Sequence, residues 1–224
     1  MASKFSATIF LCALAVLRAE DFKQTQATST ERIEFAPGGV IRLDHSIGDL
    51  YIEGWDQPAV EITVVKSTPY NFEPKHPERA GQHLERIQVH TERRSNTELA
   101  ITTMLPSHAG VEYVIHVPRE SRLEIKHRTG YVFVNDVRGD IQATGARGDI
   151  LLMLPAAGAY SIDAQTKFGT ISSDFEGPLQ VARYRLGERY AMGNGSNHHI
   201  RLRMGFGGIT IKALQPESST TTLK

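Results

Sequence analysis

Apolar and polar residues alternate in short runs along most of this chain, most cleanly over residues 111–118. There Val111, Tyr113, Ile115 and Val117 fall on one side of the pattern. Alternation with a period of two is typical of a strand that buries one face. Further runs of this kind, rich in valine, isoleucine and threonine, are separated by glycine, proline and asparagine. The pattern predicts an all-β fold made of many short strands.

Residues 128–155 carry a regular glycine pattern around which the other runs can be arranged. Gly130, Gly139 and Gly148 follow one another at intervals of nine residues. A nine-residue step holds one short strand and one tight turn, and glycine reaches positive φ in such a turn without a steric cost. The segment therefore predicts stacked short strands, a β-solenoid-like repeat with about 18 residues in each two-strand layer. Each glycine is followed two positions later by a β-branched residue, namely Val132, Ile141 and Ile150.

The sequence of glycine, polar residue and apolar residue recurs outside this segment. It occurs at residues 48–52 and returns less regularly after Pro155. The stretch around Gly169 resembles the stretch around Gly207, and we interpret the 38 residues between them as about two layers of the stack. The glycines expected to serve as structural turn residues are Gly48, Gly130, Gly139, Gly148, Gly169 and Gly207.

Residues 1–19 have the pattern of a secretory signal. Lys4 provides a positive start, and residues 5–17 form an apolar stretch of the length of a signal core, too short to span a bilayer comfortably. We expect cleavage near Ala19, with an uncleaved anchor as the alternative. Cys12, the one cysteine, would leave with the signal, so the mature chain would contain neither a disulfide nor a reactive thiol. No later segment is apolar for long enough to cross a membrane.

The rest of the chain is predicted to form one folded unit with polar ends. Residues 20–32 are expected to be a flexible lead-in, residues 33–214 the repetitive β domain, and residues 215–224 a disordered tail. An insert over about residues 67–86 interrupts the domain with three prolines, and residues 77–86 predict a short helix that begins at Pro77. The two ends of the stack are expected at residues 33–43 and 209–214, where a partner strand could add to an exposed edge.

The charge balance limits the classes of partner. The chain has 25 Lys and Arg against 25 Asp and Glu. A near-neutral protein is not expected to have nucleic acid or an anionic membrane as its main partner.

Two Arg-Gly-Asp triplets, at residues 138–140 and 147–149, could present a receptor-binding loop. We interpret both as solvated turns, because the nine-residue repeat already explains their glycines. The adjacent pair His198 and His199 could contribute to a metal site, but side chains next to each other on a strand point to opposite faces. No metal ligand, and no cofactor, is predicted from it.

No catalytic residue is predicted. The chain has no G-x-S-x-G motif, and the glycine-rich residues 205–208 lack the lysine of a phosphate-binding loop. Acidic pairs that stacking could bring together would support a carbohydrate-active enzyme on a β-solenoid, which we keep as the alternative function. The candidate pairs are Asp136 with Asp140, and Asp163 with Asp174.

Four features together, the signal-like start among them, resemble a bacterial family, DUF4097. The other three are the repeated glycine elements, the V-x-Y-x-I-x-V-P strand of residues 111–118, and the F-G-G-I-T-I sequence of residues 206–211. The resemblance covers residues 33–213. It implies a repetitive "toastrack" β fold and an adhesin-like function, and it brings no catalytic residues.

These observations favour an exported, non-enzymatic β-repeat protein that acts as a surface or envelope interaction module. Its location would be the periplasm, the cell surface or the extracellular space. Its partner would be an envelope protein or a glycan.

Overall fold

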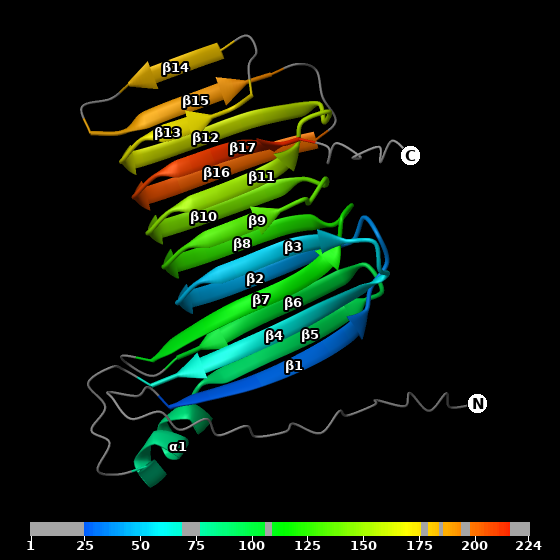
Figure 1. The fold of residues 1–224 in the computed structure, drawn as a ribbon, viewed down its shortest axis with the longest axis vertical. Helices are drawn as coiled ribbons and strands as arrows, with labels where there is room; N and C mark the ends of the chain where they lie inside the picture. Colours follow the sequence, from blue (N-terminus) through cyan, green and yellow to red (C-terminus); the bar gives the residue numbers. More distant parts are fainter. Residues whose placement is uncertain are drawn as a thin grey trace, which may run out of the picture.

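The computed structural model describes residues 25–68, 77–105, 109–175, 179–183, 186–193 and 198–215. The expected signal, including Cys12, and all of the expected tail except Gln215 lie outside these ranges. The described residues form two β-sheets that face each other across one core, with a helix at one end (Figure 1). Among them, no helix combines the length and the apolar character that a membrane span requires.

Sheet A has eight strands. In spatial order they are β1 (Gln26–Glu34), β4 (Ala59–Ser67), β7 (Gly110–Pro118), β3 (Leu50–Trp55), β9 (Val132–Asn135), β11 (Ile150–Pro155), β17 (Ile209–Leu214) and β13 (Ile171–Ser173). Sheet B has nine. In spatial order they are β14 (Leu179–Arg183), β15 (Glu188–Met192), β12 (Tyr160–Phe168), β16 (His198–Phe206), β10 (Ile141–Arg147), β8 (Arg122–Thr129), β2 (Val40–Ile47), β6 (Glu98–Met104) and β5 (Gln88–Ser95).

Five pairs of successive strands make up the repeat. In each pair, a strand of sheet B turns directly into a strand of sheet A, and neighbouring pairs run parallel. Gly130 and Gly148 lie in adjacent layers, since Val132 pairs with Ile150. The all-β stack predicted from the sequence is confirmed. In stacking order the pairs are β2–β3, β8–β9, β10–β11, β16–β17 and β12–β13.

The order of the layers differs from the order of the chain. The last pair, β16–β17, enters between two earlier pairs, so Ile209 is the direct neighbour of Ile171. The interpretation of this 38-residue separation as two layers was therefore wrong. Strands β14 and β15 occupy the intervening chain, and they extend sheet B sideways as antiparallel edge strands.

Two expectations about the ends of the domain were also wrong. Residues 26–32 of the expected flexible lead-in belong to β1, which pairs with β4 along its whole length. Because β1 is an edge strand exposed on most of both faces, it shows no apolar alternation in the sequence. The expected end strand at residues 209–214 is β17, which lies between β11 and β13. Ile41, in the other expected end, is fully buried in β2 between β8 and β6.

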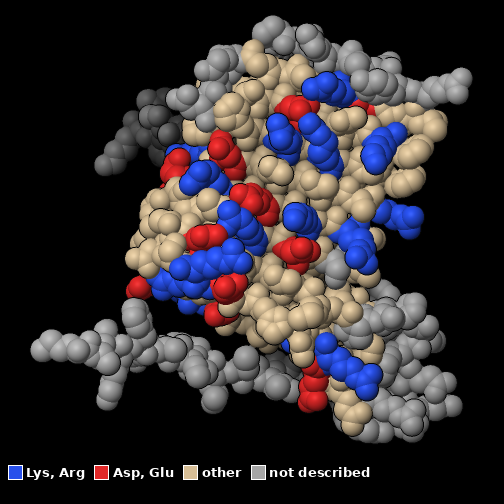
Figure 2. Space-filling model, turned by 180° about the vertical axis from the view of Figure 1, so that it is seen from behind, with Lys and Arg blue, Asp and Glu red and all other residues tan. Residues whose placement is uncertain are grey.

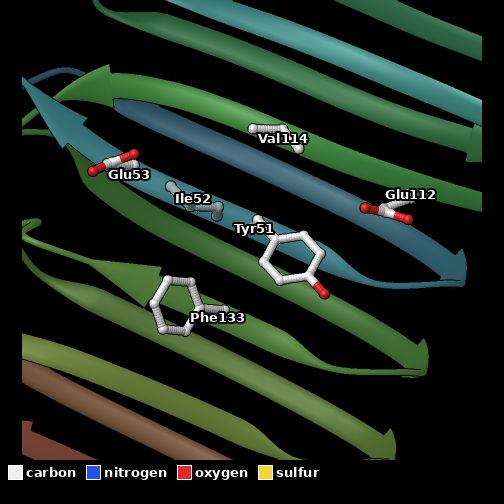
Figure 3. Close-up of a pocket in the computed structure, with 6 residues that line it drawn as sticks. All are labelled: Tyr51, Ile52, Glu53, Glu112, Val114 and Phe133. Carbon is white, nitrogen blue, oxygen red and sulfur yellow. The ribbon is translucent and has the colours of Figure 1, made fainter. Parts of the chain in front are cut away.

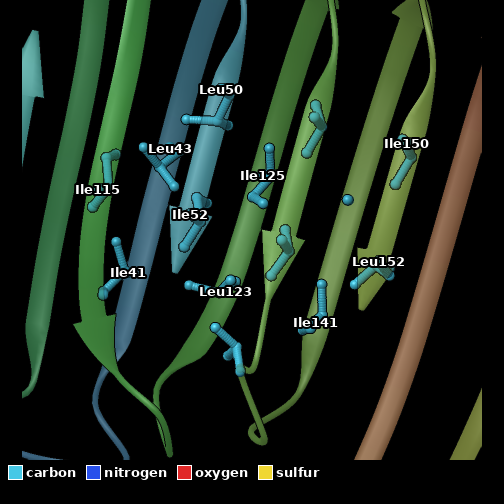
Figure 4. Close-up of a cluster of buried hydrophobic side chains, with 14 of the residues drawn as sticks. Ile41, Leu43, Leu50, Ile52, Ile115, Leu123, Ile125, Ile141, Ile150 and Leu152 are labelled. Carbon is cyan, nitrogen blue, oxygen red and sulfur yellow. The ribbon is translucent and has the colours of Figure 1, made fainter. Parts of the chain in front are cut away.

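The core lies between the two sheets. Figure 4 shows inward side chains from sheet B, such as Leu43 and Ile125, meeting inward side chains from sheet A, such as Ile52 and Leu152. All four are at most 2 % exposed. Each buried side chain of this size contributes roughly 1.5–3 kcal/mol to the free energy of unfolding. Helix α1 (Pro77–Glu85), which confirms the predicted short helix, adds Leu84 to this core.

A row of glycines holds the layers at close spacing where sheet B turns into sheet A. All members of this glycine row have positive φ. At Gly148, φ is +122° and a Cβ atom would lie 2.0 Å from the carbonyl oxygen of Gly130 in the next layer. Only glycine fits, because the backbone of one layer occupies the space of that side chain. In stacking order the glycine row consists of Gly48, Gly130, Gly148, Gly207 and Gly169.

Gly139 differs from the glycine row. It lies in the opposite kind of turn, from sheet A to sheet B, and its φ is not positive. A Cβ atom there would still lie 2.2 Å from the carbonyl oxygen of Ser121. Glycine is needed at this position for close approach of two backbones, not for positive φ. The nine-residue step of the sequence thus alternates between two turns with different requirements.

Candidate functional site

The outer face of sheet A carries a row of apolar side chains across four neighbouring strands. The register places Val114 of β7 beside Tyr51 of β3, and Tyr51 beside Phe133 of β9. Leu151 of β11 comes next. These side chains point outward because the residues on either side of each point into the core. Tyr51 is 37 % exposed, and its ring centroid lies 6.2 Å from that of Phe133. A solvated sheet face usually carries polar residues here, so this apolar row is a candidate binding surface.

An open groove of about 370 Å³ lies over the apolar row. Its walls combine the rings of Tyr51 and Phe133 with the carboxylates of Glu53 and Glu112. In Figure 3 the two carboxylates stand on opposite sides of Tyr51. Val114 and Ile52 complete the lining, which contains no Lys or Arg. The groove therefore offers ring faces for an apolar surface and acceptors for hydrogen-bond donors.

The hydroxyl of Tyr51 is a donor in this groove at neutral pH. Burial raises the pKa of Tyr51, and the negative charges of Asp49 and Glu112 raise it further. A phenol with a raised pKa stays protonated and can donate a hydrogen bond to a ligand.

A cluster of rings and charges borders the groove beside Glu53. The His116 ring stacks on Trp55 at a centroid distance of 5.1 Å, and the Arg32 guanidinium lies 5.1 Å from the centroid of the same Trp55 ring. Nε2 of His116 lies 3.6 Å from a carboxylate oxygen of Glu53, and Nδ1 lies 3.8 Å from one of Glu61. These contacts place the His116 imidazole between two carboxylates, one of which, Glu53, borders the apolar row.

The opposite side of the molecule has a different character. Seen from behind in Figure 2, Lys and Arg side chains are interspersed with Asp and Glu. On sheet B, Arg42 pairs with Glu98 and Glu124, while Asp163 pairs with Arg189 and Arg203. Exposed pairs of this kind contribute little to stability and solvate the surface. The outer face of sheet A is thus distinguished from that of sheet B by its apolar row.

The two Arg-Gly-Asp triplets lie in turns of the stack, and their aspartates bind the neighbouring layer. Asp140 accepts a hydrogen bond from the backbone N–H of His199 at 2.8 Å, and Asp149 accepts one from that of Gly208 at 2.6 Å. Asp49 does the same for Tyr131 at 2.9 Å. These carboxylates join adjacent layers, which agrees with the interpretation of the triplets as turns of the repeat.

Replacing Asp149 with alanine should lower the free energy of unfolding by about 1–2 kcal/mol, because the N–H of Gly208 loses a charged acceptor. Asp149→Asn should cost less, since an amide oxygen can still accept. Urea melts of both variants measure the difference. Asp44→Ala is the matched control, because that carboxylate is exposed and forms no hydrogen bond or ion pair among the described residues. A loss no greater in Asp149→Ala than in Asp44→Ala would show that the interlayer hydrogen bond does not stabilise the stack.

His198 and His199 do not act together. Both belong to β16, where Ile200 points into the core, so the two imidazoles lie on opposite faces of the strand. The ring of His198 lies 6.3 Å from that of Tyr160, while His199 is exposed. Within the described ranges, no group of three or more His, Cys, Asp and Glu is arranged to hold a metal ion.

The acidic residues considered for an enzyme each bind a partner of their own. Asp136 accepts a hydrogen bond from Arg119 at 2.6 Å, and Asp174 lies 3.3 Å from Nζ of Lys212. Burial alone would raise the pKa of Asp163, but Arg203 and Arg189 outweigh it and lower that pKa. A catalytic acid requires the opposite shift. Nothing in these contacts selects either pair for glycoside hydrolysis.

The structure reveals a buried histidine pair that the sequence analysis did not single out. His45 of β2 and His127 of β8 are 2 % and 5 % exposed, and their rings stack with centroids 5.0 Å apart. Tyr113 meets His45 edge to face at 4.9 Å and hydrogen-bonds to Thr103 at 2.7 Å. Alternation could have found the pair, because both histidines occupy the inward position two residues after an isoleucine or leucine.

Burial lowers the pKa of His45 to about 4, and the neighbouring His127 lowers it further in the same direction. Burial also lowers the pKa of His127. Nε2 of His45 and both ring nitrogens of His127 are buried without a hydrogen bond of good geometry among the described residues. The pair is therefore neutral at pH 7 and belongs to the core.

Comparison with known proteins bears on the fold. No family model and no curated protein matches the chain. A candidate cell adhesion protein from Clostridium sporogenes has a crystal structure that covers 86 % of this chain and 100 % of its own, with a TM-score of 0.52 at 13 % identity. The two share a fold. A candidate adhesin from Bacteroides fragilis covers 83 % and 97 %, with a TM-score of 0.34 at 10 % identity. At such identities the function must be argued from the surface of this chain itself.

Proposed function

We propose that this protein is an exported, non-enzymatic binding module of the adhesin type, related to the DUF4097 family, that recognises a glycan through the outer face of sheet A. The observation that carries the proposal is the apolar row of Val114, Tyr51, Phe133 and Leu151 with its groove. The signal-like pattern of residues 1–19 supports export to the periplasm, the cell surface or the extracellular space.

The chemistry of the groove favours a glycan over an envelope protein as the partner. Aromatic rings pack against the apolar C–H face of a sugar ring, and carboxylates accept hydrogen bonds from its hydroxyl groups. Glu53 and Glu112 flank Tyr51 and supply such acceptors. The groove is open and lies on a flat sheet, so an extended chain could pass along it without a conformational change. The similarity in fold to a candidate cell adhesion protein supports a role of this kind.

A carbohydrate-active enzyme is the second candidate function, because such an enzyme would bind the same kind of ligand as a glycan-binding module. The acidic residues considered for catalysis are engaged by cations or backbone N–H groups, which does not favour it. Release of reducing sugar ends during incubation with a bound glycan would support the enzyme instead.

Binding of the mature protein to an array of envelope and extracellular oligosaccharides tests the proposal. Tyr51→Ala with Phe133→Ala should weaken binding to any captured glycan at least tenfold, about 1.4 kcal/mol, because the stacking surface is lost. Thr144→Ala is the matched control, since Thr144 is exposed on the outer face of sheet B. Equal binding by the double variant and the wild type, with unchanged melting temperatures, would refute a site on sheet A.

A further inference from the structure

Exposed large apolar side chains collect at one edge of the stack. The described residues include seven such side chains, and only Tyr51 lies away from this edge on a flat face. Leu186 is 66 % exposed, and its carbonyl accepts the N–H of Gly169 at 3.1 Å. Met104 is the last residue of β6, which runs parallel to β2 and ends at the same side. The other four adjoin members of the glycine row, and they are Ile47, Tyr131, Phe168 and Phe206.

The stacking of the layers aligns the positions that precede the turn glycines; this line, with Tyr131, Met104 and Leu186 at the same side of the stack, is called the apolar edge. The residues that precede the turn glycines are register partners from β2 to β12, in the order Ile47, Thr129, Arg147, Phe206 and Phe168. Five strands at a spacing of about 4.8 Å give a line roughly 19 Å long. The rings of Phe168 and Phe206 stack at 4.5 Å with an interplanar angle of 4°. In Figure 1 the turns of these layers follow one another along the left side of the stack.

Three cations accompany the apolar edge. Arg128, Arg147 and Lys167 are exposed, and none pairs with a carboxylate among the described residues. The guanidinium of Arg147 lies 6.0 Å from the centroid of the Phe206 ring. The nearby carboxylates of Asp49 and Asp149 each accept a turn N–H of the next layer. Among the described residues, the edge therefore presents cations without a carboxylate partner beside acids that already accept a hydrogen bond.

The shape and charge of the apolar edge indicate which kind of partner it binds. Its exposed apolar side chains lie at and beside the turns of successive layers, whereas a protein partner would need a groove that matches them. A lipid bilayer accepts protruding aromatic and aliphatic side chains at the boundary of headgroups and acyl chains, and its phosphates attract Arg and Lys. We propose that the apolar edge docks this protein on the surface of a bilayer that contains anionic lipid. The chain is near-neutral overall, so insertion of the apolar residues supplies most of the attraction and the three cations add to it.

Co-sedimentation of the mature protein with vesicles tests this inference. The vesicles contain phosphatidylcholine and phosphatidylglycerol at roughly 3:1, with pure phosphatidylcholine for comparison. Wild-type protein should bind, and Phe168→Ser with Phe206→Ser should weaken binding at least tenfold. Ile47→Ser with Tyr131→Ser should do the same and provides an independent pair of changes. Arg147→Gln with Lys167→Gln should weaken binding to the mixed vesicles more than to pure phosphatidylcholine.

Tyr51→Ser is the matched control, because Tyr51 has an exposure similar to that of Phe168 but lies on the flat face. It should bind vesicles as the wild type does, whatever its effect on glycan binding. Absence of vesicle binding by the wild type, or unchanged binding by both edge variants with melts like the wild type, would overturn the inference. Sedimentation velocity tests the other occupant, a second copy of this chain. If the wild type forms an oligomer that the edge variants dissociate, and it does not bind vesicles, the edge is a contact between copies and the inference is overturned.

Discussion

Alanine at position 148 is expected to lower the free energy of unfolding by about 3 kcal/mol or more, a large share of the 5–15 kcal/mol typical of a folded domain. Two costs combine there. The backbone has a φ of +122°, which an L side chain rarely adopts, and the new Cβ would lie 2.0 Å from the carbonyl oxygen of Gly130. The layers would have to separate locally to make room. Urea melts followed by circular dichroism measure the loss.

Three other glycines separate the two costs. Gly38 has a φ of +77° with open space around it, so Gly38→Ala should cost only about 1 kcal/mol. Gly139 has an ordinary φ but a blocked Cβ position, so Gly139→Ala tests close approach alone. Gly193 has neither constraint, and Gly193→Ala should change stability by less than about 0.5 kcal/mol. If Gly148→Ala proves no more costly than Gly38→Ala, the glycine row does not hold the layers together.

The wild-type protein is expected to lose stability as the pH falls from 6.5 toward 4, in part because of its buried histidines. Burial lowers the pKa of His45 in the folded state to about 4, while the unfolded chain has the ordinary value of 6.5. Between these values the unfolded chain binds a proton that the folded chain does not. The contribution is therefore fully present above pH 6.5 and is lost as the pH falls, up to on the order of 3 kcal/mol.

Comparison with His45→Phe isolates this contribution, because the effects of the surface carboxylates are common to both proteins. Phenylalanine can keep the stacking on His127 and the edge contact with Tyr113, but it cannot bind a proton. The difference in the free energy of unfolding between pH 7 and pH 5 should be smaller in His45→Phe by on the order of 2 kcal/mol. His199→Gln is the control, since His199 is exposed. Equal pH dependence in wild type and His45→Phe would show that His45 does not resist protonation in the folded state.

Local signals in the sequence determined the elements of this protein. The alternation of Val111, Tyr113, Ile115 and Val117 predicted a strand, and all four are buried in β7. Pro77 and the residues after it predicted the helix at its observed place. Both succeed because side-chain direction in a strand and the start of a helix depend on neighbours close in sequence. The interval between Gly130 and Gly148 also gave the length of one layer.

The order in which layers stack was decided only by the tertiary structure. The local sequence of β16 and β17 does not indicate that this pair inserts between β10–β11 and β12–β13. Parallel pairing joins strands through backbone groups that all residues share. The edge strand β1 was wrongly predicted to be a flexible lead-in because it is exposed on most of both faces and so shows no apolar alternation. The candidate surfaces depend on this order as well. Tyr51 and Phe133 are 82 residues apart in sequence, and only the pairing of β3 with β9 brings them together.

Except at the edge strand β1, the sequence by itself thus determined where strands form, which side of a strand is buried, and where the chain needs glycine. It did so because these properties follow from periodicity and backbone sterics over a few residues. The tertiary structure alone decided which outward residues become neighbours. It placed the apolar row on sheet A, aligned the apolar edge along the glycine turns, and stacked His45 on His127. Each of these depends on the register between strands distant in sequence, and only the packing of the whole core fixes that register.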